Sequence, residues 1–170
     1  MKFKEKTYLI TLVLFLIFLN AGIFSLAYYT QQKNADSAEK LCISEFSVIT
    51  EAFEDDILLL GETGRVQVIR SFIVYYEQKD ILLQFTDTNE KTVLSSLPNG
   101  ALVPDAHTLS TQRINGKRFI LISAPVAFSQ YTMTYAKDVS YLDEDFKSIS
   151  MVFVLTSLGA SALLALILFF

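Results

Sequence analysis

The sequence predicts an α+β domain carried between two membrane-spanning helices. Apolar stretches of 22 residues stand at each end, at 8–29 and 149–170, and neither contains Asp, Glu, Lys, Arg or His. Between them, helical periodicity gives way to short β-prone runs joined by turns. The simplest arrangement is a long N-terminal helix and a shorter helix packed on one side of an antiparallel sheet of about five strands.

Both apolar stretches have the length of a transmembrane helix, since about 20 apolar residues cross a hydrocarbon core about 30 Å thick. Lys2, Lys4 and Lys6 precede the first stretch, and basic residues are retained on the cytoplasmic side. The protein is therefore expected in the plasma membrane, with the lipid bilayer as a partner. The predicted segments are a cytoplasmic N-terminus at 1–7, spans at 8–29 and 149–170, and an extracytoplasmic domain at 30–148.

Each apolar stretch has an alternative interpretation. The first resembles a signal peptide, with Ser25, Leu26 and Ala27 as a small-x-small cleavage site, but it exceeds the core of about 7 to 15 residues usual in such peptides. An uncleaved anchor is favoured. The second is an unusual sequence for a buried core helix in so small a domain, so a transmembrane helix is favoured there too.

Charge and cysteine content narrow the function classes. Residues 30–148 carry 17 acidic and 11 basic side chains, a net charge of about −6, which argues against nucleic-acid binding. Cys42 is the single cysteine and has no internal disulfide partner. It is either a small apolar residue on a helix face or half of a disulfide between two subunits.

A helical stripe follows the first apolar stretch without a strong breaker between them. Its members recur at spacings of 4, 3, 4, 4 and 3 residues: Cys42, Phe46, Ile49, Phe53, Ile57 and Leu60. The predicted helix covers residues 36–60, and the glycines at 61 and 64 separate it from a second helix at 65–77. The stripe has two possible partners, the domain's own sheet or the same helix of a second subunit.

Five strands are predicted after residue 80. They cover residues 81–85, 92–95, 108–114, 117–124 and 131–136. Asn115 and Gly116 join the third and fourth as a tight hairpin turn. Ser140 is a plausible cap for a helix that begins at Tyr141 and continues into the second apolar stretch.

Four segments carry a resemblance to a known family. They are residues 75–87 (a helix end, a strand and an acidic turn), 91–96 (a strand), 115–125 (a central hairpin) and 131–141 (a last strand, Asp138 and an outgoing helix). Together they resemble the sensor region of a membrane-bound bacterial two-component sensor histidine kinase with a PAS-like, single Cache extracytoplasmic domain. The family usually has glycine in the first turn, where this chain has Asn89 or Glu90.

The resemblance implies an extracytoplasmic sensing and transmembrane signalling module that works as a homodimer and binds a small-molecule or peptide ligand. The kinase region, its ATP and Mg, and its contact with a response regulator belong to a continuation after Phe170. In this chain we expect no catalytic residues, no cofactor and no metal site.

The resemblance also assigns candidate residues. The ligand pocket is expected between the sheet and the loops over it, and its candidates are Arg70, Tyr75, Tyr76, Phe85, Arg113, Arg118, Tyr131 and Tyr135. The stripe from Cys42 to Leu60 is the candidate dimer and signalling helix. Cys42 is expected to face or lie near Cys42 of the second subunit. Asp138, Ser140 and Tyr141 are expected at the start of the helix through which the signal leaves.

Other functions remain open. A chemoreceptor or a cyclic-dinucleotide enzyme can have the same N-terminal sensor region with two spans. A complete two-span accessory subunit that binds a partner protein outside the cell is a third possibility. The coding sequence after Phe170 separates them. A secreted enzyme is least favoured, because the sequence has no Ser/His/Asp, Cys/His or metal constellation.

His107, the only histidine, is interpreted as a turn residue rather than a pH sensor. The acidic cluster of Glu51, Glu54, Asp55 and Asp56 is interpreted as a solvated helix face rather than a cation site.

Overall fold

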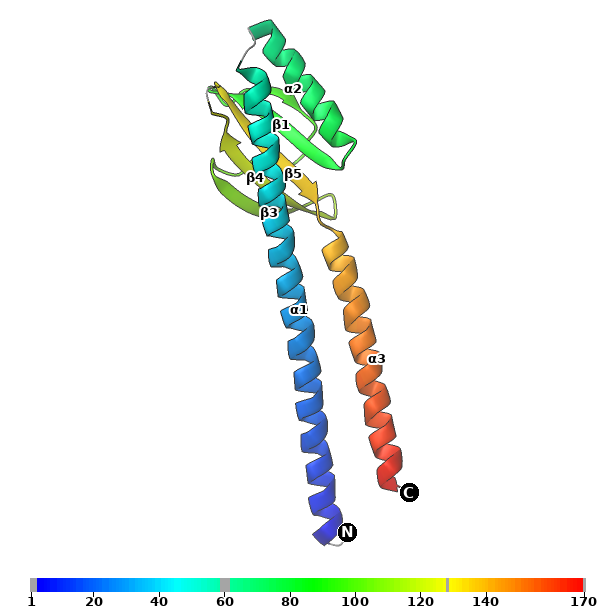
Figure 1. Cartoon of the computed structure of the whole chain (residues 1–170). Coiled ribbons are helices and arrows are strands. Elements are labelled where there is room, and N and C mark those ends of the chain that lie inside the picture. Colours follow the sequence, from blue (N-terminus) through cyan, green and yellow to red (C-terminus); the bar gives the residue numbers. More distant parts are fainter. Residues whose placement is uncertain (1–2, 59–61, 128, 170) are drawn as a thin grey trace. The chain divides into compact units, whose positions relative to one another are not determined.

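A computed structural model describes residues 3–58, 62–127 and 129–169, and confirms the predicted α+β class. The elements in chain order are α1 (Phe3–Ile57), α2 (Glu62–Glu77), β1 (Ile81–Asp87), β2 (Thr92–Ser95), β3 (Thr108–Ile114), β4 (Lys117–Pro125), β5 (Tyr131–Asp138) and α3 (Tyr141–Phe169) (Figure 1). They form two compact units. One is Ser37–Tyr141, which holds the sheet, and the other combines the residues up to Asp36 with those from Leu142 onward.

The five strands form one antiparallel sheet in the order β2-β1-β5-β4-β3. The first and last strands of the chain lie side by side, with Leu83 paired to Tyr135. On its other edge β5 pairs with β4, where Ile122 lies opposite Tyr135. The strand that leads into α3 is therefore held by neighbours on both sides.

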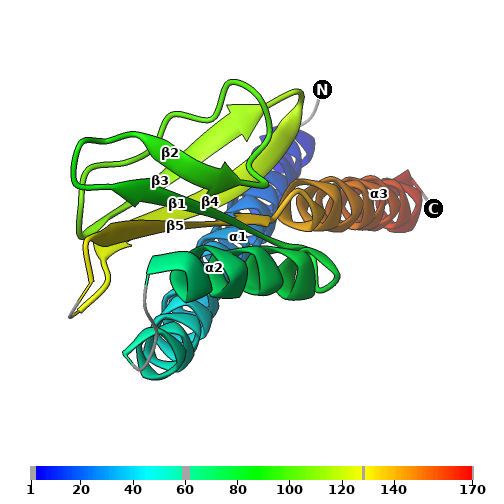
Figure 2. The same cartoon turned by 90° about the horizontal axis from the view of Figure 1, so that it is seen from above.

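The helices of this unit cover one face of the sheet, as Figure 2 shows for α2 and the adjoining part of α1. The Phe53 ring lies 4.6 Å from the Phe85 ring of β1 and 5.1 Å from the Phe72 ring of α2, measured between centroids. Cys42, Phe46, Ile49, Phe53 and Ile57 are all at most 8% exposed. Of the two partners that the sequence left open for this stripe, the chain's own sheet is the one observed. Leu60 lies outside the described residues.

A second, smaller apolar core lies on the opposite face of the sheet. It contains Ile114, Phe119, Leu121 and Ala136, against which Leu82, Leu97 and Ala101 pack. Leu97 and Ala101 belong to the connection between β2 and β3, residues 96–107. The Gln112 side chain of β3 accepts a hydrogen bond from the Leu102 amide at 3.0 Å. The connection is therefore fastened over this face.

Most element boundaries follow the sequence, with small differences at the ends. The helix predicted at 65–77 begins at Glu62 and so includes Gly64, since a glycine costs a helix only about 1 kcal/mol relative to alanine. The helix predicted to reach Leu60 ends at Ile57. Asn115 and Gly116 have φ angles of 53° and 81°, as a type I′ hairpin turn requires.

The other unit contains two helical segments that are long and apolar enough to cross a membrane, within Ile10–Ile57 and Tyr141–Leu163. Their large side chains are exposed, with Phe18 at 73% and Leu158 at 62%. Asn20 donates to the Leu16 carbonyl at 2.7 Å and accepts a hydrogen bond from Ser157. A soluble core helix would bury such apolar surface, whereas a lipid-facing helix leaves it exposed to the hydrocarbon.

Replacing Phe53 with alanine tests the helix-facing core. Phe53 is 0% exposed, and truncating a buried phenylalanine removes about 3–5 kcal/mol of unfolding free energy. We expect the melting temperature of the full chain in detergent, followed by circular dichroism, to fall by more than about 10 °C. Val48→Ala is the control, because Val48 is 61% exposed on the same helix. Equal melting of the two variants would contradict this core.

Candidate functional site

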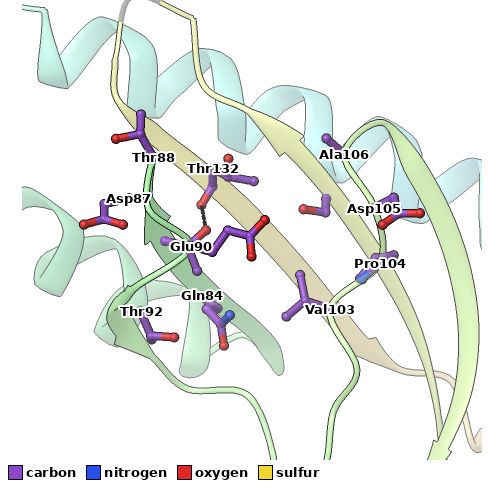
Figure 3. A pocket seen from close by; sticks show the side chains of 12 residues that line it. Gln84, Asp87, Thr88, Glu90, Thr92, Val103, Pro104, Asp105, Ala106 and Thr132 are labelled. Atoms are coloured by element: carbon purple, nitrogen blue, oxygen red, sulfur yellow. Dashed lines mark hydrogen bonds between the residues drawn. The ribbon is translucent and has the colours of Figure 1, made fainter.

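A cavity of about 610 Å³ opens on the sheet face that α1 and α2 leave uncovered (Figure 3). Its lining residues come from the sheet, from the β1–β2 turn and from the β2–β3 connection. They are Gln84, Thr86, Asp87, Thr88, Glu90, Thr92, Val103, Pro104, Asp105, Ala106, Ser123 and Thr132. A volume of this order is typical of small-molecule sites, which range from about 300 to 1,000 Å³.

Strand alternation explains the chemistry of the cavity floor. Successive side chains of a strand point to opposite faces. Since Phe85 packs on α1, its neighbours Gln84 and Thr86 point into the cavity. In the same way Tyr131 is buried, whereas Thr132 lines the cavity. The floor is therefore made of uncharged polar side chains.

Hydroxyl groups are paired beneath the cavity. The hydroxyl oxygens of Ser123 and Thr134, on β4 and β5, lie 3.3 Å apart, and these residues are 1% and 0% exposed. The Thr86 hydroxyl reaches the Thr132 carbonyl oxygen at 3.5 Å. Because buried polar groups are stable only when hydrogen-bonded, these contacts fix the floor as a hydroxylated surface between β1, β5 and β4.

The β1–β2 turn forms one wall of the cavity. It carries two carboxylates, one hydrogen-bonded within the turn and one without a hydrogen-bond partner among the described residues. Asp87 Oδ1 accepts hydrogen bonds from the Asn89 and Lys91 amides, both at 2.9 Å, and the Lys91 contact is the main cause of a lowered Asp87 pKa. Glu90 has a φ of 59°, a left-handed conformation that is unusual for residues other than glycine. Its carboxylate extends over the cavity toward Val103 (Figure 3). It makes no hydrogen bond or ion pair to any described residue.

The opposite wall is the segment from Val103 to Ala106, anchored at its end. The His107 amide donates to the Ser123 carbonyl at 2.7 Å, and the Thr108 amide to the Asp105 carbonyl at 3.0 Å. His107 is an exposed turn residue with a φ of 64°. With the apolar core beneath Leu97 and Ala101, these bonds hold the segment beside the cavity.

The cavity has the chemistry of a binding site. It presents three carboxylates, from Asp87, Glu90 and Asp105, and its lining includes no Lys, Arg or His. The described residues contain no group of three or more His, Cys, Asp or Glu side chains arranged to hold a metal ion. Hydroxyls and carboxylates in this arrangement can recognise a small polar molecule.

None of the eight residues predicted for the ligand pocket lines this cavity. Phe85, Tyr131 and Tyr135 are at most 6% exposed and belong to the set of alternate strand positions that faces the helices. Arg113 and Arg118 lie opposite each other on β3 and β4. Arg70, Tyr75 and Tyr76 belong to α2. The sequence analysis predicted a pocket between the sheet and the loops over it, and chose large residues as its candidates. On β1 and β5 these large residues lie on the face that the helices cover.

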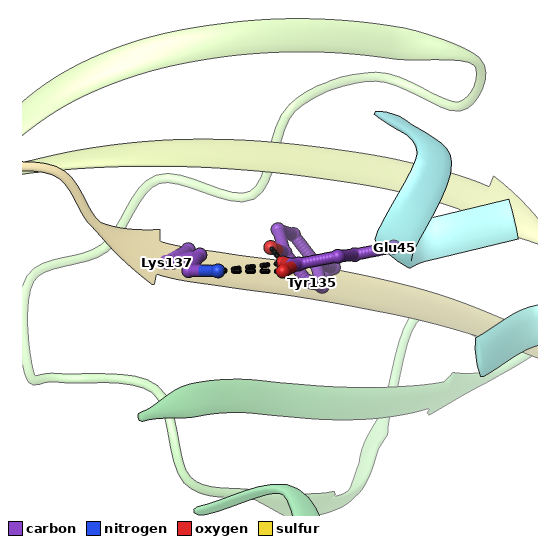
Figure 4. Close-up of polar contacts among 3 residues, drawn as sticks. All are labelled: Glu45, Tyr135 and Lys137. Atoms are coloured by element: carbon purple, nitrogen blue, oxygen red, sulfur yellow. Dashed lines mark hydrogen bonds and ion pairs between the residues drawn. The ribbon is translucent and has the colours of Figure 1, made fainter. Parts of the chain in front are cut away.

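A polar cluster joins α1 to β5 on the helix-covered face (Figure 4). Tyr135 donates from its hydroxyl to Glu45 Oε2 at 2.7 Å, and Lys137 Nζ lies 2.7 and 2.8 Å from the two Glu45 oxygens. Burial raises the pKa of Glu45, but the hydrogen bonds from Lys137 and Tyr135 outweigh it, and the net pKa is lowered. Burial and the bond to Glu45 raise the pKa of Tyr135.

Cys42 lies next to this cluster and is 1% exposed. Burial raises the pKa of its thiol, which makes it a poor nucleophile. Its own chain covers it, so a contact with Cys42 of a second subunit requires that cover to open. The dimer role of the stripe stays a prediction.

The predicted exit residues lie at the junction of β5 and α3. Asp138 Oδ2 pairs with Lys117 Nζ at 2.9 Å, while Asp138 Oδ1 accepts the Ser140 amide at 2.9 Å. The Ser140 hydroxyl oxygen accepts a hydrogen bond from the Arg118 amide at 2.8 Å. Ser140 therefore connects β4 to the segment that immediately precedes α3. Tyr141 begins α3.

The sequence contained signals for the residues that were missed. Gln84 and Thr86 alternate with Leu83 and Phe85 on β1, and Thr132 alternates with Tyr131 on β5. This alternation indicates a polar face on each of these two strands. Glu45 and Lys137 had no comparable signal, because they lie 92 positions apart and only the folded chain brings them together.

No protein-family model matches this chain, and no curated protein matches it either. The functional assignment therefore depends on the geometry of the cavity and of the polar cluster.

Glu45→Gln tests the cluster. The change removes the charge that holds Lys137 and should lower the unfolding free energy by about 1–3 kcal/mol, measured as a lower melting temperature of the full chain at neutral pH. A carboxylate with a lowered folded pKa stabilises above its unfolded pKa, and this contribution is lost as pH falls through the folded value. The difference from wild type should thus shrink below the ordinary pKa of 4.5. Glu51→Gln, an exposed site on α1, is the control. A difference that persists unchanged at pH 3 would contradict the assignment.

Proposed function

We propose that this chain is the sensing and transmembrane signalling module of a membrane-bound sensor histidine kinase. In this proposal residues 8–29 and 149–170 span the membrane, residues 1–7 are cytoplasmic and residues 30–148 lie outside. The module has a PAS-like fold, acts as a homodimer, and passes its signal to a kinase region after Phe170 that phosphorylates a response regulator.

One observation carries the proposal. β5 presents Thr132 to the cavity on one face and Tyr135 and Lys137 to α1 on the other, and it is followed after Asp138 by α3. The cavity floor is thus continuous in the chain with one candidate span and hydrogen-bonded to the helix that contains the other. A binding event at the floor can act on both helices through a single strand.

The mechanism needs two states that the ligand distinguishes. A ligand with equal affinity for both states shifts no equilibrium, however tightly it binds. The floor and walls of the cavity belong to different elements, β1, β4, β5 and the β2–β3 connection. A ligand that bridges them favours the state in which they are closest, and the Glu45 contacts adjust to that state. The kinase region is then biased through α1 and α3.

The proposed topology is testable by cysteine labelling. In a Cys42→Ser background, Asn99→Cys should react with a membrane-impermeant maleimide in intact cells, because residue 99 lies in the exposed β2–β3 connection. Lys6→Cys should react only after the membrane is permeabilised, since the N-terminus is proposed to be cytoplasmic. Labelling of Lys6→Cys in intact cells would reverse the orientation.

Sensing is testable in a fusion of residues 1–170 to the relay and kinase regions of a sensor kinase with a transcriptional reporter. Glu45→Gln and Lys137→Met break the contact between α1 and β5, and we expect each to change reporter output several-fold. Glu51→Gln should leave the output at the wild-type level, and immunoblotting checks equal membrane amounts. Wild-type output from both cluster variants, at equal amounts, would reject this signalling route.

A further inference from the structure

We propose that the cavity binds a small molecule that carries a protonated amine, with the Glu90 carboxylate as its charged partner. The inference rests on the proposed sensing function and names the class of ligand. It starts from the cavity of about 610 Å³, whose lining has three carboxylates and no Lys, Arg or His. Such a lining attracts cations and repels carboxylates and phosphates.

The three carboxylates differ in availability. Asp87 already accepts two backbone amides of its own turn through Oδ1. Asp105 lies on the β2–β3 connection, where its backbone carbonyl receives the Thr108 amide. The Glu90 side chain has no hydrogen-bond or ion-pair partner among the described residues and reaches across the cavity (Figure 3). The Glu90 carboxylate can therefore engage a ligand without breaking an existing contact, and its reach over the cavity distinguishes it from Asp105, whose carboxylate points away from the cavity in Figure 3.

The floor matches the remaining donors of an ammonium group. A protonated primary amine has three N–H donors and no acceptor. Thr132 lines the floor and its hydroxyl offers acceptor lone pairs, while the Ser123 hydroxyl lies just beneath, paired with Thr134. One carboxylate and one or two hydroxyls can satisfy the three donors, and Val103 and Pro104 provide apolar contact for a short carbon chain.

A metal ion fits the cavity less well than an organic cation. Mg²⁺ and Ca²⁺ need several oxygen ligands converging at about 2.0–2.6 Å. In the described parts of the chain no three carboxylates converge as such a site requires. An ammonium ion needs only one carboxylate with neutral acceptors beside it.

Calorimetry on the full chain in nanodiscs tests the proposal, with ethanolamine and 1,4-diaminobutane as amine probes and acetate and succinate as acid probes. We expect an amine probe to bind, the acids not to bind, and Glu90→Gln to weaken amine binding at least about tenfold. Glu90→Gly should lose the same affinity while relaxing the left-handed turn, which separates the charge from the backbone conformation. Glu51→Gln should bind as wild type does.

Three outcomes count against the amine class. Absence of amine binding, preference for the acids, or equal binding by wild type and both Glu90 variants overturns it. The sensing function is judged separately in the reporter fusion. If an acid probe binds and changes the output, sensing stands and the amine class falls. If Glu90-dependent amine binding leaves the output unchanged, the ligand class stands and the proposed sensing function falls.

Discussion

The alternation of side chains along β5 is the constraint on which the rest of the sheet-bearing unit depends. Tyr131, Met133 and Tyr135 fill the space under the helices, and Thr132 and Thr134 occupy the other face. A shift of one residue in register would exchange these sets, burying hydroxyls against α1 and exposing aromatic rings. The dry helix interface and the polar cavity are therefore two consequences of one register.

The sequence predicted the elements well because their signals are local. Asn115 and Gly116 set a hairpin turn by their tolerance of positive φ, and the stripe through Phe53 set the buried face of α1. The cavity depended on information that is not local. Choosing between the two faces of β5 requires knowing which one the helices cover, and the aromatic candidates Tyr131 and Tyr135 lie on the helix-covered face, away from the cavity. Glu45 and Lys137 meet only through the tertiary fold.

The Glu45 cluster has a role that apolar packing alone does not supply. Leucine or phenylalanine side chains tolerate small sliding movements of a helix over a sheet, because dispersion contacts have no direction. A carboxylate that binds both the Tyr135 hydroxyl and the Lys137 ammonium has one good position. We infer that it sets the register of α1 on β5. The ion pair is partly exposed, with side chains 24% and 28% accessible, so it can exchange with water when the helix moves.

The central position of β5 limits the movements through which the proposed signal could pass. A strand paired on both edges cannot slide alone, because it would break its backbone hydrogen bonds to β1 and β4 together. The contact of α1 with the sheet consists of side chains, so a shift of α1 on the sheet leaves the backbone hydrogen bonds of β5 intact. Under the proposed sensing function, a signal that reaches β5 from the cavity should therefore appear as movement of the sheet against α1. Because Asp138 and Ser140 tie the end of β5 to Lys117 and Arg118, the start of α3 must follow the sheet.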